Sequence, residues 1–242
     1  MAVIRPTLEE PKAIVPLGDG AVLVDFAEGV DIAVNAGIQR LARAVRRKRL
    51  SWISDVVPGI ASLALHLDVQ ALGDKDALAA ADAMIKECLK RGLGIDDPVR
   101  TIEVPICYDE AFGLDLRAVS EALGMPIDEI ARRHAASDFS VLMMGFAPGH
   151  PYLGGLDRAL AVPRRATPRA KVPAGSVGIA NRQSVVYPYE LPGGWNIVGR
   201  TPLKLFNATE EDPSLFEPGD AVRFITIDRV EFDQIAKDEG TA

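Results

Sequence analysis

The stretch Gly145-Phe146-Ala147-Pro148-Gly149-His150-Pro151-Tyr152-Leu153-Gly154-Gly155 separates two parts of the chain that differ in character. It follows an apolar run, 139–144, that is typical of a β-strand. Four glycines and two prolines in this span predict a fixed loop with an unusual backbone, because glycine admits left-handed conformations and proline fixes φ. The residues before the loop predict a scaffold, and those after it carry the candidate chemistry.

Short segments separated by dense turns follow the loop. Prolines recur from Pro148 to Pro202, so helices are not expected there. Alternating and β-branched residues predict five strands, at 177–180, 184–187, 195–198, 203–206 and 221–227. Short strands at this spacing predict a closed or nearly closed β-barrel.

Two short helices are predicted before the loop. The first begins at Asp115, a candidate N-cap, and ends at Gly124, and the second begins at Pro126. Helical spacing places His134 on the buried side of the second helix, just before the strand at 139–144. This position favours a packed core histidine, with an active-site role as the alternative.

The N-terminal part alternates strands and helices. Strands are predicted at 21–26, 53–57, 62–67 and 101–106, and helices follow Asp31 and either Asp74 or Asp76. The order β-α-β-β-α-β is that of a ferredoxin-like sandwich, an antiparallel sheet with two helices on one face. We therefore expect an α+β protein with a ferredoxin-like α/β domain at 1–107 and a β-barrel domain at 108–242 that carries the site.

The composition argues against several classes of protein. The 242 residues carry a net charge of −7, whereas nucleic-acid and anionic-membrane binding need an excess of cations on one face. Residues 1–12 hold no apolar core segment, and no window approaches the roughly 20 apolar residues of a membrane span, so a cytoplasmic protein without a signal peptide is expected. Cys88 and Cys107 lack metal-ligand spacing, which predicts free buried thiols and no metal site.

The cationic turns are the main candidate for chemistry. The sequence contains no phosphate-binding GxxxxGK[ST] loop, no HExxH, no GxSxG elbow and no dinucleotide fingerprint after a strand. Arginine and lysine on rigid turns suit a carboxylate, carbamate or phosphate, because guanidinium groups bind planar oxyanions through paired hydrogen bonds. A solvated basic loop is the alternative. The donors are Arg164, Arg165, Arg169, Lys171, Ser176, Arg200 and Thr201, with His150 and Tyr152.

Three long motifs resemble one known family. The runs GFAPGHPYLGGLD, VPRRATPRAKVPAGSVGIA and YPYELPGGWNIVGRTPLKLF are similar to the family that contains allophanate hydrolase subunit 1, the B subunit of bacterial 5-oxoprolinase and the Kip-type histidine-kinase inhibitor, with the carboxyltransferase domain, subdomain C and D. The resemblance extends over nearly the whole chain. It implies a small N-terminal α/β domain, a C-terminal cyclophilin-like β-barrel and a companion subunit with a related barrel.

This chain departs from the family's pattern at a few positions. His150 stands where an apolar aromatic residue is usual, and Asn181-Arg182 with Ser184-Val185 replace smaller residues. These differences concern the choice of substrate, whereas the glycines and prolines that frame the site match the pattern.

The resemblance implies a subunit of an ATP-dependent amide-cleaving enzyme, foremost 5-oxoprolinase, which converts 5-oxoproline to glutamate. Arg169, Lys171 and Arg200 are then expected to stabilise the developing oxyanion, and His134 or His150 to carry a proton. The expected partners are a companion subunit (subunit 2 or the C subunit), a LamB-type A subunit and a small amide or ureido substrate. ATP would bind in the complex, on this chain or a partner, and no cofactor is expected to be covalently bound. The expected substrate-binding residues are Gly145, Pro148, Gly149, Tyr152, Ser176, Trp195 and Thr201.

Two other functions remain open within the same family. One is a carboxyltransferase or allophanate hydrolase component of urea breakdown, which would use carboxybiotin carried on another protein; the chain lacks the Ser-Ser-Lys signature expected for amide hydrolysis of allophanate. The other is a histidine-kinase inhibitor that acts by binding. The proline-rich loops and the basic first helix of this chain are compatible with docking to a kinase.

Overall fold

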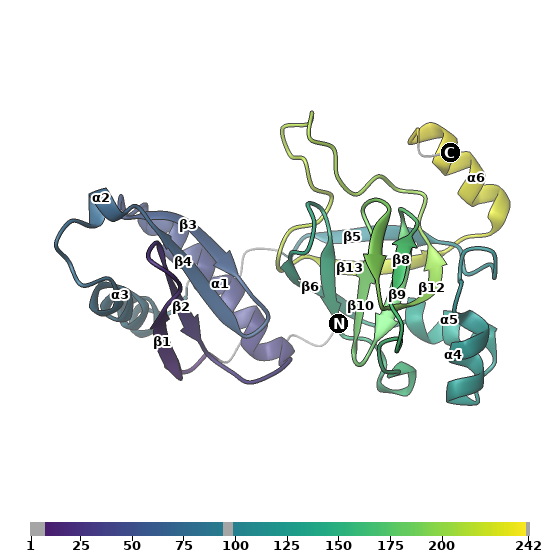
Figure 1. Cartoon of the computed structure of the whole chain (residues 1–242), viewed down its shortest axis with the longest axis horizontal. Coiled ribbons are helices and arrows are strands. Elements are labelled where there is room, and N and C mark those ends of the chain that lie inside the picture. The colour runs from purple at the N-terminus through teal and green to yellow at the C-terminus, as the bar shows by residue number, and fades with distance from the viewer. Residues whose placement is uncertain (1–7, 94–98, 241–242) are drawn as a thin grey trace. The chain divides into compact units, whose positions relative to one another are not determined.

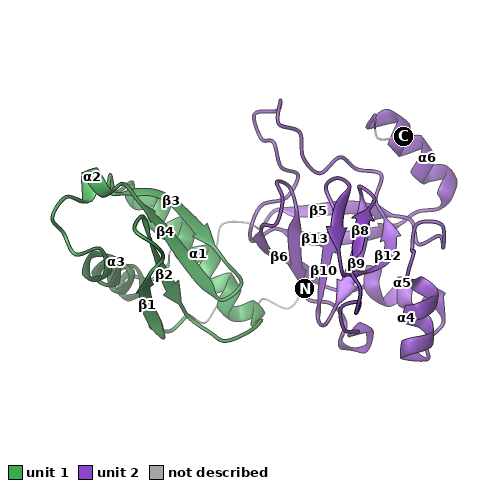
Figure 2. Cartoon of the chain, in the orientation of Figure 1, with its two compact units in different colours: residues 1–98 green, residues 99–242 purple. Residues whose placement is uncertain are grey.

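The computed structural model describes residues 8–93 and 99–240, which belong to two units, 1–98 and 99–242 (Figure 2). Part of the segment 1–12, for which no signal peptide is expected, lies outside the described residues. No helix in the described ranges is long and apolar enough to cross a membrane.

Unit 1 is a four-stranded antiparallel sheet with helices (Figure 1). Its elements are β1 (Ala13–Pro16), β2 (Ala21–Asp25), α1 (Ile32–Lys48), β3 (Ile53–Pro58), β4 (Ser62–Leu67), α2 (Val69–Leu72) and α3 (Ala77–Arg91). The strand order is β1-β2-β4-β3. Val22 and Val24 of β2 and Leu63 and Leu65 of β4 alternate onto one face, where they form a core with residues of α1 and α3.

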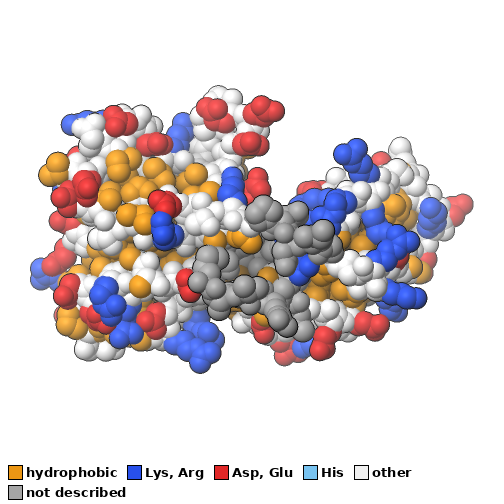
Figure 3. All heavy atoms as spheres, turned by 180° about the vertical axis from the view of Figure 1, so that it is seen from behind, with side chains coloured by type: hydrophobic (Ala, Val, Ile, Leu, Met, Phe, Trp, Pro, Cys, Tyr) orange, Lys and Arg blue, Asp and Glu red, His pale blue; other side chains and the backbone are white. Residues whose placement is uncertain are grey.

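Local sequence signals explain the long helix of unit 1. The Asp31 carboxylate accepts hydrogen bonds from the backbone N–H groups of Ala33 (2.8 Å) and Val34 (3.1 Å), as a helix N-cap does. Lys and Arg side chains are numerous on the face of unit 1 seen on the right of Figure 3. Two arginines of α1 donate hydrogen bonds to backbone carbonyls. Arg46 donates to the Val56 carbonyl (2.5 Å), and Arg47 donates to the Leu93 carbonyl (3.1 Å).

The expectation that residues 101–106 complete the N-terminal sheet is wrong. They form β5 (Thr101–Ile106), which pairs in parallel with β13 (Ala221–Thr226) in unit 2. The fourth strand of unit 1 is β1, which joins β2 through a short local turn. Unit 1 thus begins with two strands before α1, and the predicted ferredoxin-like order β-α-β-β-α-β is not found. The alternation of apolar residues identifies a strand but not the strand with which it pairs. Here β2 pairs with β1, which is nearer to it in the chain than residues 101–106 are.

Unit 2 is built around a seven-stranded sheet of order β12-β9-β10-β7-β6-β13-β5. Its remaining elements are α4 (Leu116–Leu123), α5 (Ile127–Ala135), β6 (Phe139–Met144), β7 (Pro151–Gly154), η1 (Arg158–Leu160), β8 (Arg169–Val172), β9 (Ser176–Ala180), β10 (Gln183–Val186), β11 (Leu191–Gly193), β12 (Asn196–Arg200) and α6 (Arg229–Asp238). Strands β8 and β11 pair as a separate two-stranded sheet.

A bridge between the two outer strands nearly closes this sheet into the predicted barrel. Just beyond β5, the Cys107 N–H donates to the Arg200 carbonyl (2.9 Å), and the Arg200 N–H donates to the Cys107 carbonyl (3.0 Å). Val141, Leu153 and Val177 lie in the buried core of the barrel. The predicted strand at 203–206 is reduced to one bridge, Phe206 with Ser214.

Candidate functional site

A groove on unit 2 gathers the glycine- and proline-rich loop 145–155 and two later turns. Its volume is about 250 Å³. The loop before β7, the turn before β8 and the turn between β11 and β12 contribute to its wall. The lining residues are Phe146, His150, Tyr152, Arg164, Pro168, Tyr187, Pro192, Gly193, Gly194 and Trp195.

Backbone constraints fix the loop at the mouth of the groove. Gly149 has φ +78°, and a Cβ atom there would lie 2.7 Å from the Cβ of Phe206, so only glycine fits. The Pro148 carbonyl accepts a hydrogen bond from the Tyr189 hydroxyl (2.8 Å). Phe146 also has a left-handed backbone, φ +73°, although its side chain is 63% exposed. An exposed aromatic residue held in a strained conformation is typical of a functional loop.

His150, a residue of this loop, is buried and lines the groove. It is 1% exposed, and its ring lies 5.0 Å from that of Tyr152 and 5.3 Å from that of Tyr187, centroid to centroid. Burial lowers the pKa of His150 to about 4, so the imidazole is neutral at pH 7. No described residue gives its Nδ1 a hydrogen bond.

Arg164 supplies the cation of the groove. Its guanidinium carbon lies 4.8 Å from the centroid of the Trp195 ring, a cation–π contact. Arg164 is exposed and forms no ion pair with any residue in the described parts of the chain. The guanidinium is therefore available to an anion in the groove.

The three cations predicted to stabilise an oxyanion lie outside this lining. Arg169 binds the buried Asp115 carboxylate through two hydrogen bonds of 2.7 and 2.8 Å. Lys171 is 76% exposed and pairs with Glu190 (2.8 Å). The Arg200 Nε donates to the Ala174 carbonyl (2.7 Å), and its guanidinium lies near the rings of Phe112 and Phe232.

His134 lies in the barrel core rather than in the groove. Its exposure is 0%, and its ring packs against those of Phe139 and Phe224. The Ser184 hydroxyl donates to the Gly178 carbonyl (3.1 Å), so it accepts from the His134 Nε2–H (3.1 Å). Nδ1 is then an acceptor for the Tyr108 hydroxyl (2.7 Å). This chain of hydrogen bonds fixes the Nε2–H tautomer and gives His134 a structural place.

Replacing His134 by glutamine is expected to flatten the pH dependence of stability. Burial lowers the pKa of His134 to about 3 in the folded chain, from an ordinary value of 6.5. The unfolded chain therefore binds a proton first as the pH falls, so stability present above pH 6.5 declines toward pH 3, by about 3 kcal/mol at about pH 4.5. Urea unfolding at both ends of this range should show a smaller loss for His134→Gln than for the unmodified chain, and equal losses would contradict this.

The other predicted residues divide into lining, framing and buried groups. Tyr152 and Trp195 line the groove with His150. Gly145, Pro148 and Gly149 frame the loop without lining the groove. Ser176, in β9, and Thr201, directly after β12, are 1% and 2% exposed and do not line the groove.

Sequence reasoning missed part of the groove. It gave no role to Phe146 or Tyr187 and named Arg164 only as one donor among many. The turn Pro192-Gly193-Gly194 lies against Tyr187, since a Cβ atom at Gly193 would lie 2.0 Å from the Tyr187 hydroxyl oxygen. Such a contact between distant residues is visible only once the strands are paired.

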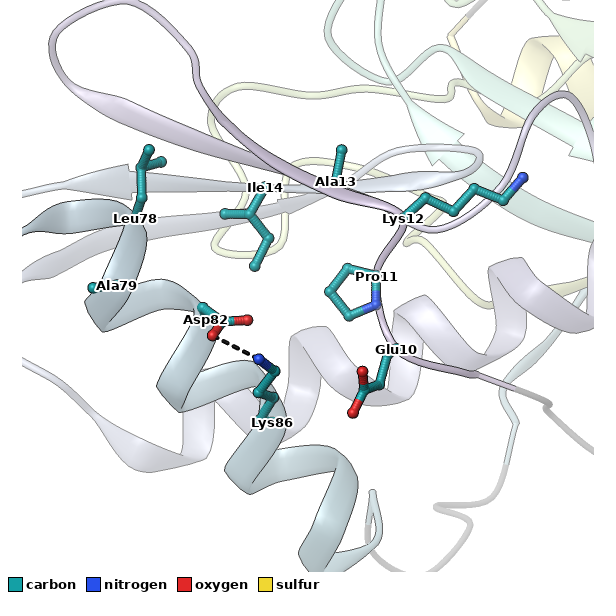
Figure 4. A pocket seen from close by; sticks show the side chains of 9 residues that line it. All are labelled: Glu10, Pro11, Lys12, Ala13, Ile14, Leu78, Ala79, Asp82 and Lys86. Carbon is teal, nitrogen blue, oxygen red and sulfur yellow. Dashed lines mark hydrogen bonds and ion pairs between the residues drawn. The ribbon is translucent and has the colours of Figure 1, made fainter.

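A second hollow lies in unit 1, with a volume of about 410 Å³ (Figure 4). Residues before and within β1 line it together with α3. The Lys86 ammonium donates to the Asp82 carboxylate (2.9 Å), so these two lining charges neutralise each other. None of the site residues predicted from the sequence lies there. In the described ranges, no three His, Cys, Asp or Glu side chains come together in a way that could hold a metal ion.

Comparisons with known proteins agree with the motifs. The chain is 34% identical over 224 residues to the B subunit of 5-oxoprolinase from Bacillus subtilis, covering 89% of this chain and 93% of that protein. It is 32% identical to the solved protein TTHA0988, with a TM-score of 0.73, over 86% of this chain and 40% of that one. The urea amidolyase structure of K. lactis shares the fold, at 20% identity and a TM-score of 0.77, over 100% of this chain and 16% of that one. Residues 12–216 match the model of the carboxyltransferase domain, subdomain C and D, and the chain belongs to this family.

Proposed function

We propose that this chain is a subunit of an ATP-dependent 5-oxoprolinase and that the groove on unit 2 binds 5-oxoproline. The first support is its similarity to a relative named as the B subunit of 5-oxoprolinase, at 34% identity over 93% of that protein's length. The relatives named urea amidolyase, at 24% identity, also belong to amide-cleaving enzymes. A hydrolase subunit is the function common to these relatives.

The observation that carries the proposal is the combination of aromatic walls with an arginine, Arg164, that forms no ion pair within the described residues. 5-Oxoproline is a five-membered lactam that bears one carboxylate. Tyr152 and Trp195 offer flat apolar surface to such a ring, and the Arg164 guanidinium can bind the carboxylate through paired hydrogen bonds. The Arg169 guanidinium does not compete for the carboxylate of 5-oxoproline, because it is already bound to the Asp115 carboxylate.

The proposal assigns binding to this chain and part of the chemistry to partners. An amide carbon resists attack by water, and ATP would activate it by phosphorylating the amide oxygen. The groove contributes a fixed position for the lactam ring and exclusion of water from one face. A companion subunit with a related barrel, a LamB-type A subunit and the ATP site complete the proposed cytoplasmic complex. In this proposed complex, unit 2 is the cyclophilin-like barrel domain of the subunit.

Replacing Arg164 by glutamine should lower kcat/KM for 5-oxoproline by about 10- to 100-fold, the worth of a charge-assisted hydrogen-bonded pair. The effect should fall mainly on KM, since the carboxylate is bound equally in the ground and transition states. The measurement is ATP-linked turnover of 5-oxoproline by this chain co-expressed with its genomic neighbours.

A matched variant, Arg158→Gln, removes another exposed arginine of unit 2 that does not line the groove, and should keep the original kcat/KM. Unchanged turnover in Arg164→Gln would contradict the binding of 5-oxoproline in the groove. A complex that consumes neither 5-oxoproline nor ATP would overturn the assignment to 5-oxoprolinase.

A further inference from the structure

Phe146, in the loop at the mouth of the groove, has a backbone conformation that disfavours a bulky side chain. Its φ is +73°, and in this left-handed region the Cβ atom of any residue other than glycine is crowded by the backbone. Two other non-glycine residues in the described ranges have a positive φ: Arg49 ends α1, and Asn181 is of a type that tolerates this conformation. Neither reason applies to Phe146, so its backbone costs free energy in the unliganded chain.

The side chain of Phe146 does not offset this cost by burial. It is 63% exposed, and its ring meets that of His150 edge-on, with the two centroids 5.5 Å apart. A phenylalanine stabilises a fold through the apolar surface that it removes from water, and most of this surface stays in water here. An aromatic residue that is both strained and exposed indicates a role in binding, because such strain persists where function uses it.

The position of Phe146 makes the groove the place where its ring is used. Phe146 lines the groove together with Trp195. Two backbone hydrogen bonds fix the loop around it: the Gly145 N–H donates to the His150 carbonyl (3.2 Å), and the His150 N–H donates to the Ala147 carbonyl (3.0 Å). Because the loop is already fixed, little conformational freedom is lost when a ligand packs against the ring.

We infer that Phe146 is a substrate-binding residue whose ring packs against the apolar face of the lactam ring of 5-oxoproline. This inference rests on the proposed function and adds to it the residue that shields the lactam from solvent. The lactam ring carries two methylene groups, and an aromatic ring can cover their apolar surface. Arg164 binds the carboxylate, whereas Phe146 excludes water from the ring of the same ligand.

The test measures binding and stability in the same variants. Phe146→Asn and Phe146→Gly remove the ring, and asparagine and glycine both tolerate a positive φ. In the assembled complex, the dissociation constant for 5-oxoproline should rise by about threefold to tenfold, the worth of burying roughly 25–55 Å² of apolar surface. In the full chain without partners, the midpoint of urea unfolding should stay the same or rise, because backbone strain is released. Phe146→Tyr keeps the ring and the strain, so it should retain the original dissociation constant and midpoint.

A dissociation constant that is unchanged in both Phe146→Asn and Phe146→Gly would overturn the role of Phe146 and leave the proposed function intact. A lower unfolding midpoint in both variants, together with weaker binding, would make Phe146 a structural residue and would also overturn the inference. If both variants failed to assemble with the companion subunits, Phe146 would be an anchor for another protein, and its assignment to the lactam would be wrong. Absence of 5-oxoproline binding by the unmodified complex would instead overturn the proposed function.

Discussion

Asp115→Asn is expected to destabilise unit 2 by about 3–5 kcal/mol, the usual cost of removing one partner of a buried ion pair. Asp115 is 3% exposed, and its carboxylate binds Arg165, the Arg169 guanidinium (2.7 and 2.8 Å) and the backbone N–H of Ile197 (2.7 Å). An asparagine there would keep the shape but leave both half-buried guanidinium groups without a counter-charge. Because Arg165 also anchors Gly194 through its N–H (2.8 Å), the groove should loosen as well.

Urea unfolding in a Trp52→Phe background measures this effect, because Trp195 then reports on unit 2 alone. The matched control is Glu190→Gln, which breaks the exposed pair with Lys171 and should cost less than about 1 kcal/mol. If Asp115→Asn lowered the free energy of unfolding no more than this control, that would contradict the claim that Asp115 links α4 to the turns that line the groove.

Gly155→Ala should destabilise unit 2 by about 4 kcal/mol or more, from backbone strain and a clash that cannot relax. Gly155 has φ +106°, and a Cβ atom there would lie 2.0 Å from the Asp138 carbonyl oxygen and 2.9 Å from its carbon. Both atoms belong to the backbone just before β6, so no side-chain rotation can make room. Glycine is needed here because the chain leaving β7 runs against the start of β6.

The variant Gly124→Ala tests the cost of backbone strain in the absence of a steric clash. Gly124 also has a left-handed backbone, φ +60°, but no atom lies within 4 Å of its Cβ position. The alanine variant should therefore lose only about 1 kcal/mol. Similar losses for the two variants, measured by the same unfolding assay, would contradict the close approach of Gly155 to Asp138.

Local periodicity predicted much of the fold. The strands at 62–67 and 139–144 were expected at the residues where β4 and β6 occur, because apolar residues alternate or run together there. Pairing over long distances was not predictable in this way. The strand at 101–106 pairs with β13, 120 positions further along the chain, and its own residues carry no mark of that choice. β1 was missed because it is short and only half-buried.

The candidate site shows the same division. The density of glycine and proline predicted a fixed loop with an unusual backbone at 145–155, where Phe146, Gly149 and Gly155 have positive φ values. Charge alone did not distinguish the arginines, because Arg169 and Arg164 look alike in sequence and only the fold pairs Arg169 with Asp115. Asp115 itself was expected to cap α4, but its side chain makes no cap hydrogen bond and binds the arginines instead.

The most direct test of the proposed function is to locate 5-oxoproline by a crystal structure of the assembled complex grown with that ligand. We expect the lactam in the groove of unit 2, stacked against Trp195, with its carboxylate within hydrogen-bond distance of the Arg164 guanidinium. Density for 5-oxoproline at another site, with the groove free of it, would contradict the proposed function of the groove.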